Sequence, residues 1–205
     1  DGMRTQTVGV TQALLDSAKK EFLQYGFEKA SLRRISAVSG VSTNSIYTRF
    51  QDKAGLFRAV VKETADGLLL LYEGSIKEAA ACDDMGTATE AGDEGTRQVL
   101  SYIYEHIEEC KLLFCGAAGT EYASFFDRLA AMEESYYKEM AQQFSREGSM
   151  VDDFFIHVVC RNGWQYIYEL LTHDKSYEEA VQYMEDVRVF QYAGWQAVLH
   201  YGRQK

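Results

Sequence analysis

Proline is absent from all 205 residues of this chain. Proline lacks a backbone N–H and clashes with the preceding helical turn, so a chain without it escapes the strongest interruption of helices. Apolar residues recur with a period of 3.6 over long segments, and the alternating runs typical of strands are few. The sequence therefore predicts an all-α fold.

Capping signals divide the N-terminal part into helices. We expect a first helix over residues 11–25, ended by Gly26 in a left-handed conformation. Two short helices follow, separated by Gly40, and Ser42 caps the second of them. Asp52 is expected to cap a long fourth helix.

The rest of the chain also predicts helices, with one long interruption. The segment 81–95, ACDDMGTATEAGDEG, is small, acidic and glycine-rich, and we predict a loop there. Ser176 and Glu179 form a capping box that begins the last helix. The expected helices are 96–110, a short turn at 112–118, 122–146, 151–172 and 176–201.

Charge is distributed unevenly along the chain. The net charge is −10, yet residues 1–58 hold nine lysines and arginines against five acidic residues, a net +4 that leaves −14 for the remainder. Electrostatic attraction acts over a Debye length of about 8–10 Å, so a basic segment can bind a polyanion while the acidic part stays away from it.

Other sequence signals concern location. No apolar run approaches the length of a membrane span, and the N-terminal stretch shows no signal peptide. No two cysteines form a CxxC pair, so we expect reduced thiols at Cys82, Cys110, Cys115 and Cys160. We expect a cytoplasmic protein with no membrane partner.

The stretch GVSTNSIYTRF at residues 40–50 predicts the second helix of a helix-turn-helix unit. Val41, Ile46 and Phe50 suffice as inner anchors, whereas the outer face is polar without being strongly charged, as suits a helix in the major groove. Hydroxyl groups suit phosphate oxygens, an asparagine can read adenine, and a threonine methyl can meet a thymine methyl. The outward candidates are Ser42, Thr43, Asn44, Ser45, Tyr47, Thr48 and Arg49.

The run LLDSAKKEFLQYGFEKASLRRISAVSGVSTNSIYTRFQDKAGLF resembles the N-terminal domain of the TetR family of transcriptional regulators. The resemblance covers about residues 8–60 and includes the Gly26-Phe27 cap, the Gly40-Val41-Ser42 turn and the pair Leu56-Phe57. It implies a helix-turn-helix DNA-binding domain over residues 1–55 and a helical effector-binding and dimerisation domain over residues 56–205.

The resemblance also implies roles for single residues. Tyr47 and Thr48 occupy the pair that contacts phosphate, although Thr48 departs from the aromatic version, and Arg49 stands where histidine is common. Lys53 resembles the family's phosphate-binding lysine, and Arg33 matches a position that reaches a base in some members. Plain structural interpretations remain open: Arg33 and its neighbour Arg34 as solvated side chains, Tyr47 as packing, and Ser42 as a cap.

The last two expected helices carry many large apolar residues, more than one buried stripe requires. They predict a homodimer in which two helices from each subunit form a four-helix interface. A two-fold dimer places its two recognition helices about 34–36 Å apart on a double-stranded DNA operator.

The central segment and its neighbours predict a pocket for an apolar or aromatic small-molecule effector, because apolar walls with a few polar groups are typical of such sites. The alternative is that the same residues are ordinary core. The candidate residues are Tyr102, His106, Cys110, Tyr122, Phe126, Trp164 and Tyr168.

No sequence motif predicts a cofactor, a metal or a catalytic site. His106 and Cys110 could share a metal, but no third ligand is visible. There is no glycine-rich phosphate loop, GxSxG or HExxH. We therefore predict a DNA-binding regulator, a repressor released by a small molecule. The alternatives are a regulator that responds to a protein partner or to no ligand, and an all-helical enzyme.

Overall fold

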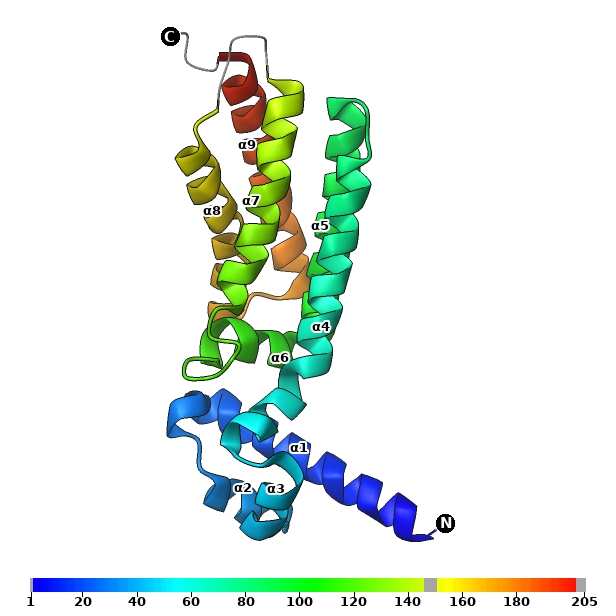
Figure 1. The fold of residues 1–205 in the computed structure, drawn as a ribbon, viewed down its shortest axis with the longest axis vertical. Coiled ribbons are helices and arrows are strands. Elements are labelled where there is room, and N and C mark those ends of the chain that lie inside the picture. Colours follow the sequence, from blue (N-terminus) through cyan, green and yellow to red (C-terminus); the bar gives the residue numbers. More distant parts are fainter. Residues whose placement is uncertain (1, 146–150, 202–205) are drawn as a thin grey trace. The chain divides into compact units, whose positions relative to one another are not determined.

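The computed structural model describes residues 2–145 and 151–201. These residues form helices and contain no β-strand, which confirms the predicted all-α class (Figure 1). None of these helices is both long enough and apolar enough to cross a membrane. Packing divides the chain into two compact units, residues 1–67 with 106–125, and residues 68–105 with 126–205. The sequence-based division into residues 1–55 and 56–205 stays a prediction.

The first unit contains the predicted helix-turn-helix. Its buried side chains include Leu14, Phe22, Ile35, Ile46 and Phe57, all at most 1% exposed. Its elements are α1 (Gly2–Lys29), α2 (Leu32–Ser39), α3 (Thr43–Phe50), the first part of α4 (Lys53–Ala80), α6 (Ile107–Lys111) and the π-helical turn η1 (Leu112–Gly116).

The predicted caps of this unit are present. The Ser42 hydroxyl accepts from the backbone N–H of Ser45 at 3.1 Å, and the Asp52 carboxylate accepts from Gly55 N–H at 2.7 Å. Gly40 ends α2 in the left-handed conformation, and Gly26 has φ 70° and ψ 167° where α1 bends. Gly26 therefore has the predicted positive φ, but its ψ lies outside the left-handed helical region that the sequence predicted, whereas Gly40 ends its helix as predicted.

Gly55 makes the turn between α3 and α4 possible. A Cβ at this position would lie 1.8 Å from the carbonyl oxygen of Phe50. No side chain fits at that distance, so the start of α4 approaches the end of α3 only because residue 55 is glycine.

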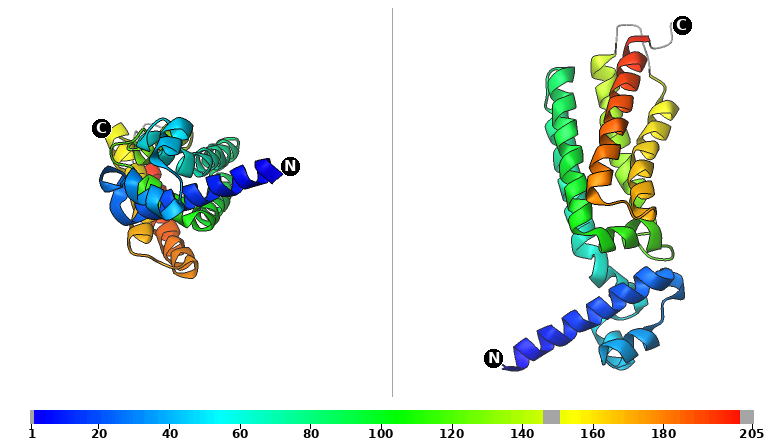
Figure 2. Two further views of the ribbon diagram at one scale, coloured as in Figure 1. Left: turned by 90° about the horizontal axis from the view of Figure 1, so that it is seen from below. Right: turned by 180° about the vertical axis from the view of Figure 1, so that it is seen from behind.

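The second unit is a set of long helices. Figures 1 and 2 show the rest of α4 running antiparallel to its successor, α5. Buried residues of the last three helices form one cluster, which includes Met140, Ile156, Cys160 and Leu199. The remaining elements are α5 (Met85–Glu105), α7 (Phe125–Phe144), α8 (Asp153–Thr172) and α9 (Tyr177–Tyr201).

The loop predicted over residues 81–95 is wrong for most of its length, because α5 begins at Met85. The Asp84 carboxylate accepts from the N–H groups of Gly86 and Thr87 at 2.9 and 3.1 Å, and so caps the helix. Gly95, the last residue of the predicted loop, is a packing residue within α5. A Cβ there would lie 2.6 Å from the Cβ of Ser75 on α4.

Other helix boundaries agree only in part with the predictions. The first helix begins at residue 2 rather than residue 11, and it is broken at Gly26, as predicted, before a short helical segment that ends at Lys29. The predicted helix 96–110 is interrupted at His106, which has φ −121° and ψ 37°. The Ser176–Glu179 capping box is confirmed by hydrogen bonds of 2.9 and 3.2 Å between the two residues.

Glu21 joins α1 to α2 within the first unit. Its carboxylate is 8% exposed, and its Oε1 accepts from Ser31 N–H and from Arg34 Nε, both at 2.8 Å. Burial alone would raise the pKa of Glu21, but the hydrogen bonds from Arg34 and Ser31 outweigh it and hold the pKa below the ordinary 4.5. The ionised carboxylate therefore stabilises the folded unit.

We predict that Glu21→Gln lowers the free energy of unfolding by about 1–3 kcal/mol at pH 7, because a buried donor set loses its charged acceptor. Since the folded-state pKa is depressed, this contribution is present above about pH 4.5 and is lost as the pH falls through the folded-state value. Urea unfolding of wild type and variant at pH 7 and pH 3.5 measures both. The control is Asp16→Asn, at an exposed position of α1. An equal difference in unfolding free energy between wild type and variant at both pH values would contradict the prediction.

Candidate nucleic-acid interface and effector cavity

The outer face of α3 is polar and exposed in the first unit. Ile46 is fully buried, whereas Tyr47, one residue later, is 53% exposed. Asn44, Thr48 and Arg49 are exposed as well. The helix therefore presents hydroxyl, amide and guanidinium groups on one side and an apolar anchor on the other, which is the division that groove binding requires.

Several predicted DNA-contacting side chains also make internal hydrogen bonds. The Thr48 hydroxyl donates to the carbonyl oxygen of Asn44 at 2.9 Å, and Arg49 Nη1 donates to the Thr11 hydroxyl at 3.0 Å. The Ser42 hydroxyl caps α3 and lies 3.0 Å from the hydroxyl of Ser45. Thr43 is half-buried at the first position of the helix. The capping interpretation of Ser42 is thus confirmed.

The two arginines of α2 differ in their surroundings. Arg33 is exposed. Arg34 donates to Glu21, and its guanidinium lies 4.3 Å from the centre of the Tyr25 ring. Arg34 therefore has a structural role in fixing α2 on α1, while Arg33 stays the candidate for DNA.

Lys53, at the start of α4, binds the end of α1. Its Nζ donates to the carbonyl oxygens of Glu28 at 3.0 Å and Ala30 at 3.2 Å, and lies 4.6 Å from the centre of the Phe27 ring. An ammonium group carries three donors, so these two bonds leave one donor for a phosphate oxygen. The sequence did not reveal the internal role, because residue 53 meets residues 28 and 30 only in the folded unit.

The seven predicted effector residues are divided between the two units. His106, Cys110 and Tyr122 belong to the first unit. Cys110 is fully buried, and burial raises the pKa of its thiol to about 12. The Tyr122 ring lies 6.3 Å from that of Phe57, inside the same unit.

The other four predicted effector residues, Tyr102, Phe126, Trp164 and Tyr168, belong to the second unit. The Trp164 indole is buried and packs edge-on against Tyr72 at 4.9 Å between ring centres. The Arg161 guanidinium lies 5.5 Å from the centre of the Phe126 ring. Tyr102 and Tyr168 are half-buried. The seven residues are thus divided between two units, and their common site stays a prediction.

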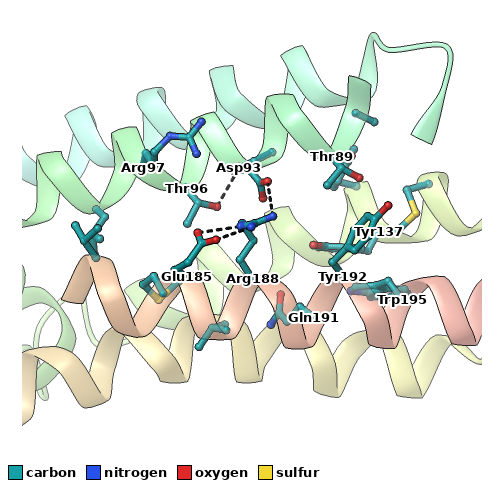
Figure 3. A pocket seen from close by; sticks show the side chains of 18 of the residues that line it. Thr89, Asp93, Thr96, Arg97, Tyr137, Glu185, Arg188, Gln191, Tyr192 and Trp195 are labelled. Carbon is teal, nitrogen blue, oxygen red and sulfur yellow. Dashed lines mark hydrogen bonds and ion pairs between the residues drawn. The ribbon is translucent and has the colours of Figure 1, made fainter. Parts of the chain in front are cut away.

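A cavity of about 300 Å³ lies elsewhere in the second unit, between α5, α7 and α9 (Figure 3). None of the seven predicted residues lines it. The sequence did contain a signal for this cavity wall, because the lining residues of α5 recur three or four positions apart between residues 85 and 100. Most of them lie in the segment that was predicted as a loop. The α5 lining residues are Met85, Ala88, Thr89, Gly92, Asp93, Thr96, Arg97 and Leu100.

One end of the cavity is aromatic. The rings of Tyr137 on α7 and Trp195 on α9 stack with centres 4.7 Å apart and planes 11° apart. Tyr136 and Tyr192 line the same end, where the Tyr192 hydroxyl accepts from Gln196 at 2.6 Å. Such a surface offers a large apolar area with a few polar groups, as small-molecule sites do.

The middle of the cavity is ionic. Arg188 on α9 binds Glu185 through Nη2 at 2.5 Å and Nε at 3.0 Å, and binds Asp93 on α5 through Nη1 at 3.3 Å (Figure 3). Burial raises the pKa of Asp93 despite the nearby Arg188 and Arg97, which oppose the rise. Among the described side chains, no three His, Cys, Asp or Glu residues are placed to hold a metal ion.

The sequence of the first unit is similar to that of known regulatory proteins. Residues 14–60 match the family model for bacterial regulatory proteins, tetR family. The chain is 38% identical over 53 residues to the HTH-type transcriptional repressor Rv1474c of Mycobacterium tuberculosis, which covers 26% of this chain and 28% of that protein. It is 30% identical to the HTH-type transcriptional repressor AcnR of Corynebacterium glutamicum, over 38% of this chain and 47% of that protein. The chain thus matches less than half the length of these curated relatives.

A solved structure is similar over nearly the whole chain. A protein from Pseudomonas aeruginosa PAO1 described as a transcriptional regulator matches with a TM-score of 0.60, over 92% of this chain and 93% of that one. The identity is 17%, so this likeness shows the fold alone.

We predict that Lys53→Met lowers the free energy of unfolding by about 1 kcal/mol, because the end of α1 loses two charge-assisted hydrogen bonds. Urea unfolding followed by circular dichroism measures the change. Lys20→Met, at an exposed position of α1, is the control and should leave stability within about 0.5 kcal/mol of wild type. Equal stabilities of the two variants would show that the Lys53 contacts contribute nothing.

Proposed function

We propose that this chain is a member of the TetR family of bacterial regulatory proteins, and that it acts as a dimeric DNA-binding transcriptional repressor that a small-molecule effector releases from its operator. The observation that carries the proposal is the exposed polar face of α3 above a fully buried Ile46, within the segment that matches the family. The major groove of DNA admits one helix of this kind.

The α3 side chains suit two kinds of contact. The Tyr47 hydroxyl, the Arg49 guanidinium and the third donor of Lys53 suit phosphate oxygens, which position a protein on DNA without reading its sequence. Asn44 can pair with adenine, and Thr43 at the helix start can meet a thymine methyl. Ser45, Thr48 and Arg33 complete the proposed surface, and Ser42 contributes as the N-cap of α3, whose other first-turn N–H groups suit a phosphate oxygen.

Two substitutions on α3 test the DNA contacts. Tyr47→Ala should weaken binding about tenfold to operator and non-operator duplexes alike, because it removes a phosphate contact. Asn44→Ala should change the preferred sequence, at a cost of about 1–3 kcal/mol in discrimination at one base pair. Selecting fragments of the source genome on the immobilised protein supplies the operator, and fluorescence anisotropy at several salt concentrations measures affinity. Unchanged binding by Tyr47→Ala would remove that residue from the interface.

We propose that the dimer forms through α8 and α9. Phe154 and Val158 lie four residues apart on one side of α8, and Tyr183 and Phe190 lie seven apart on one side of α9. All four are large and exposed in the single chain, and Phe154 and Phe190 are each 72% exposed. Apolar side chains concentrated on two neighbouring helices mark an interaction surface, and two such pairs make a four-helix interface.

The proposed interface predicts that Phe190→Asp weakens the dimer by about a hundredfold, because a charge replaces a central aromatic contact. Sedimentation velocity over a range of protein concentrations measures the change. The matched control is Leu70→Asp, which alters an equally exposed apolar residue, also 72% exposed, on α4 of the same unit. Dissociation of the Leu70 variant, or a Phe190 variant as dimeric as wild type, would place the interface elsewhere.

We propose that the effector binds in the α5–α7–α9 cavity. Release requires an effector that binds the arrangement incompatible with DNA more tightly than the other, since a ligand with equal affinity for both shifts nothing. Helix α4 contributes residues to both units, so it is one of the covalent links through which occupancy of the second unit can reach the first.

A further inference from the structure

We propose that the α5–α7–α9 cavity takes an amphipathic organic cation, with an ammonium-type head at Asp93 and an apolar or aromatic body against Tyr137 and Trp195. The inference rests on the proposed function, because it names the chemical class of the effector at that same site. Two features carry it: unequal sharing of one arginine by two carboxylates, and the position of the aromatic end.

The guanidinium group of Arg188, in the middle of the cavity, is paired mainly with one carboxylate, that of Glu185. Arg188 forms two hydrogen bonds with Glu185, at 2.5 and 3.0 Å, and one longer contact of 3.3 Å with Asp93. Among the residues that the structure describes, this contact is the only ion pair of Asp93. A carboxylate has about four acceptor positions, so Asp93 keeps most of its capacity for a further donor.

The second arginine of the cavity is also engaged by a carboxylate. Arg97 donates to Glu94 Oε2 through Nε at 3.1 Å and Nη2 at 2.9 Å. The lining holds two carboxylates, Asp93 and Glu185, and two guanidinium groups, while Glu94 lies outside it. Because Arg97 is paired with Glu94 and Arg188 chiefly with Glu185, Asp93 is the lining carboxylate with the weakest pairing. The second unit as a whole is acidic, with twenty-one acidic residues against ten lysines and arginines.

These charges favour a cationic ligand over an anionic one. A carboxylate ligand would have to displace Glu185 or Asp93 from Arg188 while lying beside both, and like charges in a partly desolvated site repel. An ammonium group would instead add a second cation to Asp93 without breaking the Arg188–Glu185 pair. The pKa of Asp93 agrees, because burial raises it and the existing arginines do not compensate fully.

The aromatic end sets the length of the ligand. Arg188 and Trp195 are seven residues apart on α9, so they share a face and are separated by about 10 Å along the helix axis. The Tyr137–Trp195 stack and the rings of Tyr136 and Tyr192 can hold an apolar body at that distance, and their faces attract positive charge as well. A ligand about 10 Å from head to ring centre matches the cavity.

Three probes of equal shape separate charge from apolar burial. We would measure the dissociation constants of 6-phenylhexylamine, 6-phenylhexan-1-ol and 6-phenylhexanoate by titration calorimetry at pH 7. The expected order is amine, alcohol, carboxylate, with the amine bound about tenfold more tightly than the carboxylate. A carboxylate bound as tightly as the amine, or no binding of any probe, would overturn the proposal.

Variants locate the head group. Asp93→Asn, which keeps the side chain's shape, should weaken amine binding about five- to tenfold and leave the alcohol unchanged. Arg188→Met should strengthen amine binding, because it removes the competing cation. Glu90→Gln is the control, at an exposed α5 position outside the cavity. Thermal melting checks that each variant is folded, and unchanged amine binding by folded Asp93→Asn would refute the assignment.

The same preparation separates this inference from the proposed function. DNA binding is measured on wild-type protein without any probe. Wild-type protein that binds no genomic fragment would refute the regulator proposal, even if the amine binds as expected. Protein that binds DNA, but prefers the carboxylate probe, would refute only the cation assignment.

Discussion

The helix-turn-helix depends on one buried carboxylate. Glu21 on α1 is largely buried, and it accepts hydrogen bonds from the N–H of Ser31, just before α2, and from the Arg34 side chain of α2. An ionised group at 8% exposure is tolerated only when it is paired, so α2 is held in the one orientation that supplies both donors. That orientation leaves Arg33 exposed while Arg34 is engaged, and it explains why two adjacent arginines have different roles.

A second polar contact, made by Lys53, completes the packing of the first unit. Lys53 ties the start of α4 to the carbonyl end of α1, and the aromatic rings of Phe22, Phe27 and Phe57 pack together beneath it. The position of α3 is therefore fixed from both sides, by α2 before it and by α4 after it. A helix with few apolar anchors of its own can then present a polar surface, because neighbouring elements hold it in place.

Local chemistry explains which parts of the fold the sequence could predict. Ser42, Asp52 and Gly40 act on backbone groups within four residues, so their roles follow from sequence alone. Gly95 gave the wrong answer because its small size serves a contact with Ser75, twenty positions away. The cavity was missed for a related reason: its lining depends on which faces of α5 and α9 meet, and periodicity along one helix does not specify its partner. The division of acidic and basic residues, by contrast, was visible from the start.

The contact between Gly95 and Ser75 has a consequence for the α5–α7–α9 cavity. Gly95 does not line the cavity, but its lack of a side chain sets how closely α5 approaches α4, and α5 supplies one wall of the cavity. A larger residue at position 95 would push α5 away from α4 and so move that wall. The dimensions of the cavity therefore depend in part on a residue that does not line it.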